Sequence, residues 1–194
     1  MPVTQRDAQR HTYGDYLKWS RDYGDEVIDG VAYVREPPSP SYVHQELVVA
    51  LSSELWCALE GRSCRVCVAP LDIRLPSSDE PDEKIETVVQ PDVFIVCDRG
   101  KVDKWGVRGA PDWLAEVLSP NTAAYDQIVK IPLYESAGVP EVWLLHPIDR
   151  TLAIYRLVDG RYGRPIYQEL NGQTLLSSVP GVSVDWDRMM ARLM

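Results

Sequence analysis

Two acidic residues stand within otherwise apolar stretches, where a charged side chain is unexpected. Asp92 follows Val88-Val-Gln-Pro and precedes Val93-Phe-Ile-Val, and Glu116 lies within Trp113-Leu-Ala-Glu-Val-Leu. Near-continuous apolar runs of this length are typical of strands buried on both faces. A buried, ionised carboxylate is costly unless it is paired or coordinates a cation. Two of them on separate strands favour a site for a hard divalent cation, which prefers oxygen ligands.

Each carboxylate also has a plainer interpretation. Alone, either residue could pair with an arginine or cap a helix, and together they could act as the acid and base of a glycoside hydrolase. However, Pro91-Asp92 followed by Glu116-Val-Leu118 resembles the PD-(D/E)xK motif of metal-dependent nucleases. The motif implies that Asp92, Glu116 and the backbone carbonyl of Val117 bind Mg²⁺ or Mn²⁺, which activates a water molecule and offsets charge on the phosphate. Its lysine position is occupied here by Leu118.

The wider sequence resembles the Uma-two (Uma2) family of restriction-endonuclease-like proteins. The segments that carry this resemblance occur in order along nearly the whole chain: Glu26-Val-Ile-Asp-Gly, His44-Gln, Pro70-Leu-Asp-Ile-Arg-Leu, Val-Gln-Pro-Asp92, Ala-Pro-Asp-Trp-Leu-Ala-Glu116-Val-Leu-Ser-Pro, Asp126-x-x-x-Lys130-x-x-x-Tyr134 and Gly-Val-Pro-Glu-Val-Trp143. The resemblance implies an α/β (α+β) restriction-endonuclease-like fold, with a central mixed β-sheet flanked by helices. We expect residues 1–194 to form a single domain, with residues 1–11 as a flexible arm.

The resemblance also implies a set of catalytic residues, with the lysine moved to the helix that follows the second strand. These residues are Glu26, Asp92, Glu116 and Lys130. Asp126 and Lys130 are four residues apart and share a helix face; without the resemblance, we would interpret them as an exposed pair worth about 0.3–0.5 kcal/mol. Pro132 falls within the same helix and predicts a kink, because it cannot donate a hydrogen bond to Ile128.

Several other residues near these motifs have structural interpretations. His44 borders the apolar face of its helix, which is typical of a hydrogen-bonded boundary residue, while the resemblance favours a role in supporting the site. We expect Tyr134 to pack the helix and His146 to lie at an exposed strand end. Trp113 and Trp143 are expected in the core.

The elements that must position these residues follow from periodicity and turn signals. Asp29-Gly30 predicts a hairpin turn, and apolar residues at three- and four-residue steps predict a helix that begins at Ser41 and ends near Glu60. The remaining expected elements are a helix over 13–21, a connector over 37–40, strands over 64–69, 71–75, 88–96, 113–118, 142–145 and 152–156, a helix over 122–137 and a turn at 159–160.

Composition and charge limit the class of protein. The 194 residues are 45% hydrophobic and 25% charged, as in a soluble globular domain. The apolar runs are shorter than the roughly 18 residues of a membrane span, and there is no signal-peptide pattern at the N-terminus. We therefore expect a cytoplasmic protein with no organic cofactor and with its four cysteines reduced, despite the CxxC spacing of Cys64 and Cys67.

The net charge of −9 argues against a nucleic-acid partner. However, residues 77–86 carry five carboxylates and one lysine, a local −4, so the rest of the chain carries −5. We expect this segment to be a solvated, mobile loop. The basic residues between the two motif strands are the candidates for nucleic-acid binding, which we expect to be weak and salt-sensitive; they are Arg99, Lys101, Lys104 and Arg108.

The leading hypothesis is a Mg²⁺- or Mn²⁺-dependent endodeoxyribonuclease that hydrolyses DNA phosphodiester bonds. The alternative is a catalytically inactive nuclease fold that serves as a binding or regulatory module, which Leu118 and Pro132 favour. A homodimer is the default expectation, because two-fold assemblies are the commonest. The sequence does not distinguish DNA from RNA or indicate a target.

Overall fold

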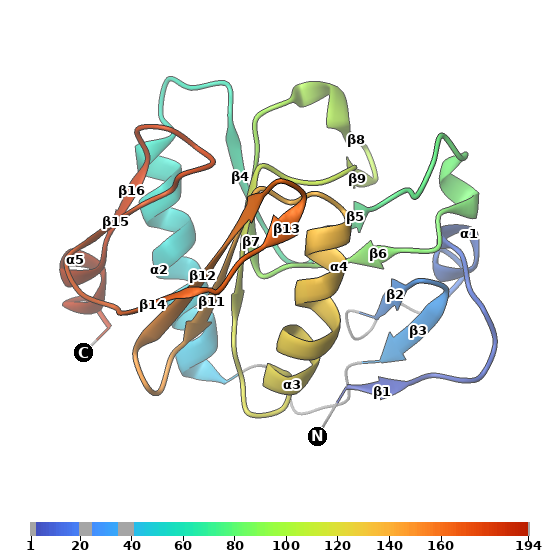
Figure 1. The fold of residues 1–194 in the computed structure, drawn as a ribbon, viewed down its shortest axis with the longest axis horizontal. Coiled ribbons are helices and arrows are strands. Elements are labelled where there is room, and N and C mark those ends of the chain that lie inside the picture. Colours follow the sequence, from blue (N-terminus) through green and yellow to red (C-terminus); the bar gives the residue numbers. More distant parts are fainter. Residues whose placement is uncertain (1–2, 20–24, 35–40, 194) are drawn as a thin grey trace.

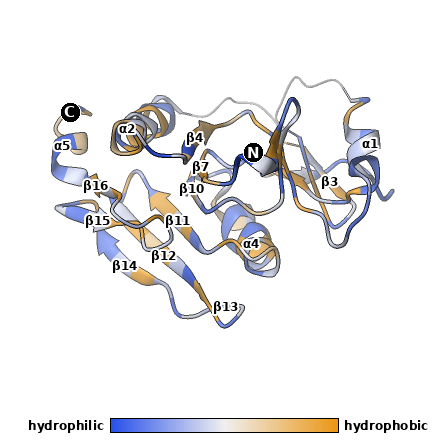
Figure 2. Ribbon diagram, turned by 90° about the horizontal axis from the view of Figure 1, so that it is seen from above, coloured by the Kyte–Doolittle hydropathy of each residue, from blue (hydrophilic) through white to orange (hydrophobic). Residues whose placement is uncertain are grey.

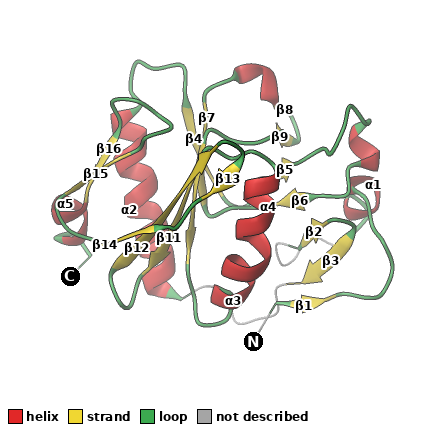
Figure 3. Ribbon diagram, in the orientation of Figure 1, coloured by secondary structure: helices red, strands yellow, loops and turns green. Residues whose placement is uncertain are grey.

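The structure is a computed structural model that describes residues 3–19, 25–34 and 41–193. Two seven-stranded sheets lie side by side, joined by the segment that contains Asp92, and a short two-stranded sheet lies near the C-terminus (Figure 1). The sheet that contains β10 and β11 has the longer strands and is called the larger sheet below. Helices cover both of its faces, as Figure 3 shows most clearly for the long helix α2 on one side and for α3 and α4 on the other. The expected mixed sheet flanked by helices is confirmed.

The larger sheet has the strand order β13-β12-β11-β10-β7-β4, with β14 pairing with β12. Its central strands β10 and β11 are parallel, and its other pairs are antiparallel. The strands are β4 (Arg65–Val68), β7 (Val93–Val96), β10 (Trp113–Val117), β11 (Glu141–His146), β12 (Thr151–Val158), β13 (Arg161–Tyr162) and β14 (Ile166–Glu169).

The smaller sheet has the order β1-β3-β2-β6-β5-β9-β8. The predicted hairpin is present, and its turn residues Asp29 and Gly30 adopt the positive φ angles, 49° and 77°, that this turn requires. Within the segment that we expected to form a flexible arm, Thr4 and Gln5 pair with β3, and the backbone N–H groups of Arg6 and His11 donate to the Ala32 and Gly30 carbonyls of this hairpin. The strands are β1 (Thr4–Gln5), β2 (Glu26–Ile28), β3 (Val31–Val34), β5 (Ile73–Arg74), β6 (Val88–Val89), β8 (Val102–Asp103) and β9 (Gly106–Arg108).

Helix α2 (Tyr42–Ala58) begins where predicted, and Ser41 caps it by accepting a hydrogen bond from the His44 backbone N–H. Its buried leucines pack on the larger sheet together with Trp113 and Trp143, which lie in the core as expected. Strands β15 (Gln173–Leu175) and β16 (Ser183–Asp185) and helix α5 (Trp186–Met190) lie on the same side. None of the described helices is long and apolar enough to span a membrane.

The remaining helices differ in part from expectation. Helix α1 spans Tyr13–Tyr16 and ends at its C-cap Leu17, so it is shorter than the predicted helix over 13–21. The predicted connector over 37–40 lies outside the described residues. The helix predicted over 122–137 is divided into α3 (Ala123–Tyr125), a π-helical turn η3 (Asp126–Lys130) and α4 (Ile131–Ser136).

The expectation of one continuous strand over 88–96 is wrong. Val88 and Val89 pair within the smaller sheet, whereas Val93–Val96 pair within the larger one. The chain changes sheets at Gln90-Pro91-Asp92, where Pro91 has no N–H to donate to a strand ladder. Asp92 therefore lies at the junction of the two sheets rather than within a strand.

Two further expectations are corrected. Cys64 and Cys97 form a disulfide, because Cys64 directly precedes β4, Cys97 directly follows β7, and the register that pairs Arg65 with Val96 places the two cysteines opposite each other. Cys57 and Cys67 are free thiols. The acidic segment 77–86 is anchored rather than a free loop. It contains a 3₁₀ turn (Asp82–Lys84), and the Asp82 carboxylate pairs with the buried Arg74 and with Arg108.

Candidate functional site

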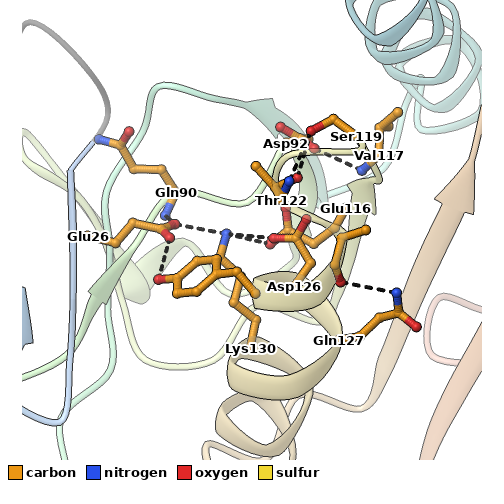
Figure 4. Close-up of polar contacts among 12 residues, drawn as sticks. Glu26, Gln90, Asp92, Glu116, Val117, Ser119, Thr122, Asp126, Gln127 and Lys130 are labelled. Atoms are coloured by element: carbon orange, nitrogen blue, oxygen red, sulfur yellow. Dashed lines mark hydrogen bonds and ion pairs between the residues drawn. The ribbon is translucent and has the colours of Figure 1, made fainter. Parts of the chain in front are cut away.

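Four charged side chains meet where the two sheets and the broken helix come together (Figure 4). The Lys130 Nζ lies 2.9 Å from Glu26 Oε1, 3.0 Å from Glu116 Oε1 and 3.8 Å from Asp126 Oδ1. Lys130 is 0% exposed and Glu116 1%. The structure thus brings two predicted catalytic residues, Glu26 and Glu116, to the buried ammonium group of a third, Lys130.

Asp92, the fourth predicted residue, lies beside Glu116 at the edge of this cluster. Its Oδ2 accepts a hydrogen bond of 2.8 Å from the Val117 N–H and lies 3.2 Å from His44 Nε2. At 6% exposed, Asp92 is the most accessible carboxylate of the cluster. The support from His44 agrees with the role that the family resemblance favours.

Strand alternation explains why Glu116 points into the cluster. In β10, Trp113, Ala115 and Val117 pack on the α2 side of the sheet, whereas Leu114 packs on the α4 side. Successive side chains of a strand point to opposite faces, so Glu116 also points towards α4. The opposing wall is Glu26 at the start of β2, whose Oε1 accepts a hydrogen bond from the Gln90 N–H.

The π-helical turn accounts for the position of Lys130. Pro132 lies in the first turn of α4, where its missing N–H costs little, and the predicted kink takes the form of the wider turn over Asp126–Lys130. Such π-bulges often occur at functional sites. Both Asp126 and Lys130 are buried and face the carboxylates, so they are not an exposed surface pair.

Two tyrosines complete the polar contacts, and one of them corrects an expectation. The Tyr134 hydroxyl donates a 2.5 Å hydrogen bond to Glu116 Oε1, so Tyr134 does more than pack its helix. The Tyr125 hydroxyl donates to Glu26 Oε2 at 2.9 Å. The four-residue spacing of Asp126, Lys130 and Tyr134 is the sequence signal that places the three on one face.

The cluster has an excess of negative charge. Three carboxylates, those of Glu26, Glu116 and Asp126, surround the Lys130 ammonium, and the Asp92 carboxylate lies beside them, so full ionisation would leave the cluster with a net charge of −3. Burial raises the pKa of Glu116 to about 8, and the Asp126 and Asp92 carboxylates add to this effect, although the Lys130 ammonium opposes it. Burial also raises the pKa of Tyr134. A hard divalent cation would relieve this excess.

The donor set fits such a cation by its chemistry. Asp92, Glu116 and Val117 lie at the carboxyl end of β10 and supply carboxylate and carbonyl oxygens, the ligands that Mg²⁺ and Mn²⁺ prefer. With the side chains as they stand, no three acidic, histidine or cysteine groups among the described residues are arranged around a common metal position. In this arrangement of the side chains, the positive charge near the carboxylates comes from the Lys130 ammonium.

The four basic residues proposed for nucleic-acid binding lie elsewhere. They belong to the edge of the smaller sheet formed by η2 (Arg99–Lys101), β8 and β9, which β5 and β6 separate from β2. Arg108 donates to Asp82 and to the Glu80 carbonyl, and Lys101 donates to the Ala110 carbonyl. The Lys104 Nζ lies 4.9 Å from the centre of the Trp105 ring.

The predicted surface histidine, His146, lies at the end of β11 and is partly exposed.

Comparison with known proteins agrees with this architecture. A crystal structure described as "a putative nuclease belonging to DUF820", from Anabaena variabilis, superposes with a TM-score of 0.72, covering 94% of this chain and 99% of that one at 18% identity. At this identity the likeness shows a shared fold. The "Uncharacterized protein slr1290" of Synechocystis is 28% identical over 133 residues, which is 68% of this chain and 65% of that protein, so the match spans less than two thirds of the relative.

The match to a protein family is broader. The family model described as "Uma2: Putative restriction endonuclease" matches residues 13–188, a range that includes every residue of the carboxylate and lysine cluster. Because this match covers nearly the whole chain, the protein belongs to the Uma2 family.

Proposed function

We propose that the protein is a Mg²⁺- or Mn²⁺-dependent endonuclease that hydrolyses phosphodiester bonds of DNA. The observation that carries this proposal is the contact of Lys130 Nζ with Glu116 Oε1 at 3.0 Å, beside Asp92, which directly precedes the neighbouring strand β7. Two carboxylates and a lysine are the groups that a PD-(D/E)xK site requires, and here the lysine comes from a helix instead of from position 118. Membership of a family described as "Putative restriction endonuclease" supports the same reaction class.

In this proposal Asp92, Glu116 and the Val117 carbonyl would hold the cation. When bound, it lowers the pKa of a coordinated water and offsets the charge that develops on the phosphate. Lys130 orients the attacking water and stabilises negative charge with its ammonium group. The carboxylates of Glu26 and Asp126 hold that ammonium in place.

The surrounding hydrogen bonds fix the geometry of these groups. The Val117 N–H and His44 hold Asp92 Oδ2, and the Tyr134 hydroxyl holds Glu116 Oε1. Groups fixed in this way lose little freedom when the substrate binds, which is what catalytic positioning requires.

The burial of the cluster favours a second candidate. Because Lys130 and Glu116 are almost fully buried, an inactive nuclease fold that binds DNA or a protein would also account for the structure. In that case the cluster would serve only to hold the two sheets together.

A cleavage assay separates the two candidates. Purified protein is incubated with supercoiled, linear and single-stranded DNA, with Mg²⁺ or Mn²⁺ and with EDTA. The nuclease proposal predicts divalent-dependent cleavage that Asp92→Ala and Glu116→Ala abolish and that Asp79→Ala, an exposed carboxylate in the acidic segment, leaves unchanged. Failure to cleave any form of DNA, together with Mn²⁺ binding that Asp92→Ala does not weaken, would favour the inactive module.

A further inference from the structure

Helix α2 has a second apolar face that points away from the core. Tyr42 is 77% exposed, Val49 61% and Trp56 66%, although the helix already buries its leucines against the larger sheet. Residues seven apart lie on the same side of a helix, so these three form one stripe along its length. Figure 2 views α2 nearly end-on and shows it at the margin of the molecule beside β4 and α5. Large exposed side chains in a row are typical of an interaction surface.

The stripe is symmetric about its centre. Tyr42 lies seven residues before Val49, and Trp56 lies seven residues after it. An antiparallel helix pair related by a two-fold axis at Val49 would therefore bring each Tyr42 against Trp56 of the second copy and each Val49 against its own counterpart. We propose that α2 pairs in this antiparallel way with α2 of a second copy of this chain.

The polar residues beside the stripe permit this pairing. The hydroxyls of Ser52 and Ser53 donate to the Val49 carbonyl of their own helix at 3.0 and 2.7 Å, so covering them leaves no donor unsatisfied. Their small size allows the helix axes to approach within about 8–10 Å. The antiparallel register places Glu46, whose Oε1 accepts from the Tyr42 hydroxyl, opposite Ser52 of the second copy, so like charges do not meet.

The area available predicts the strength of association. Aromatic side chains bury about 150–250 Å² each, so with Val49 the stripe offers roughly 500 Å² per copy and roughly 1,000 Å² for the pair. This is below the roughly 1,200–2,000 Å² of stable interfaces and in the range of weak, transient ones. We therefore expect a reversible dimer with a dissociation constant in the micromolar range.

Sedimentation velocity from about 1 to about 200 µM tests the association. The wild-type chain shifts from monomer to dimer over this range, and Val49→Glu or Trp56→Glu raises the dissociation constant at least tenfold. Tyr167→Glu is the matched control, because Tyr167 is 73% exposed but lies on β14, outside the stripe. A wild-type chain that stays monomeric throughout, or a dimer that Val49→Glu does not weaken, overturns the proposal.

Disulfide trapping tests the antiparallel register. In a Cys57→Ser background, which removes the exposed thiol of the helix, Val49→Cys forms covalent dimers on oxidation. Trp56→Cys alone does not, whereas a mixture of Trp56→Cys and Tyr42→Cys chains does. Self-linking of Trp56→Cys with none for Val49→Cys contradicts the two-fold at Val49. Both experiments are independent of DNA cleavage, so they succeed or fail separately from the proposed function.

Discussion

The Lys130 ammonium lies 3.0 Å from Glu116 Oε1, and both side chains are almost fully buried. The pair joins three separate parts of the fold, because Glu116 comes from the larger sheet, Lys130 from the π-helical turn, and the second carboxylate bound to Lys130, that of Glu26, from the smaller sheet. The same contacts that would serve catalysis also hold the two sheets against the helix. Stability and activity should therefore respond together to changes at this point.

Removal of the lysine should be costly. We expect Lys130→Met to lower the free energy of unfolding by about 3–5 kcal/mol, since it leaves buried carboxylates without their countercharge. Urea denaturation measures this change. The double variant Lys130→Met with Glu116→Gln should lose less than the sum of the two single variants, because each single variant already disrupts the contact that the two side chains share. A loss below about 1 kcal/mol for Lys130→Met would contradict the role of Lys130 as countercharge.

The raised pKa of Glu116 predicts how stability depends on pH. In the folded, metal-free protein its pKa is about 8, against an ordinary value of 4.5. Between these values the folded state holds a proton that the unfolded state has released, so the free energy of unfolding falls as pH rises, by at most about 1.4 kcal/mol per pH unit. This contribution is fully present below pH 4.5 and is lost as pH rises through about 8.

Urea denaturation in EDTA at several pH values within this range measures the slope. Glu116→Gln provides the comparison, because it cannot ionise and should have a flatter pH dependence than the wild-type chain. Equal slopes in the two proteins would show that Glu116 is already ionised at neutral pH in the folded state.

Much of the fold follows from local patterns in the sequence. Asp29-Gly30 predicts its hairpin through turn geometry, and the apolar spacing after Ser41 predicts α2 to within a few residues. The break between β6 and β7 is different, because a run of apolar residues looks the same whether it belongs to one buried strand or to two in separate sheets. The one local signal of that break is Pro91, because proline has no N–H to donate to a strand ladder.

The candidate site shows the same limit. Spacing places Asp126, Lys130 and Tyr134 on one helix face, but it does not show whether that face is buried or exposed. The carboxylate that Lys130 contacts at 2.9 Å comes from Glu26, a residue of a distant hairpin in another sheet. The disulfide between Cys64 and Cys97 is also beyond local patterns, because it depends on the register between two strands and not on the CxxC spacing.

The contact between His44 and Asp92 predicts an effect on metal binding. His44 Nε2 lies 3.2 Å from Asp92 Oδ2, and no described residue hydrogen-bonds its buried Nδ1. Because groups that orient a metal ligand usually contribute 10–100-fold to affinity, we expect His44→Ala to weaken Mn²⁺ binding about tenfold while the protein stays folded. Calorimetric titration with Mn²⁺ measures this, with His146→Ala as a control on a partly exposed histidine. Unchanged Mn²⁺ affinity would show that the Val117 N–H alone orients Asp92.

The anchored acidic segment gives the last prediction. The guanidinium of Arg74 is fully buried and pairs with Asp82 and Asp103, and Asp82 also pairs with Arg108. Asp82→Ala should lower the free energy of unfolding by about 1–3 kcal/mol, because it leaves part of a buried, charged hydrogen-bonding group unsatisfied. Asp79→Ala, in the same segment but exposed, should change it by less than about 0.5 kcal/mol. Thermal and urea denaturation compare the two variants, and equal effects would mean that the segment does not depend on the pairing between Asp82 and Arg74.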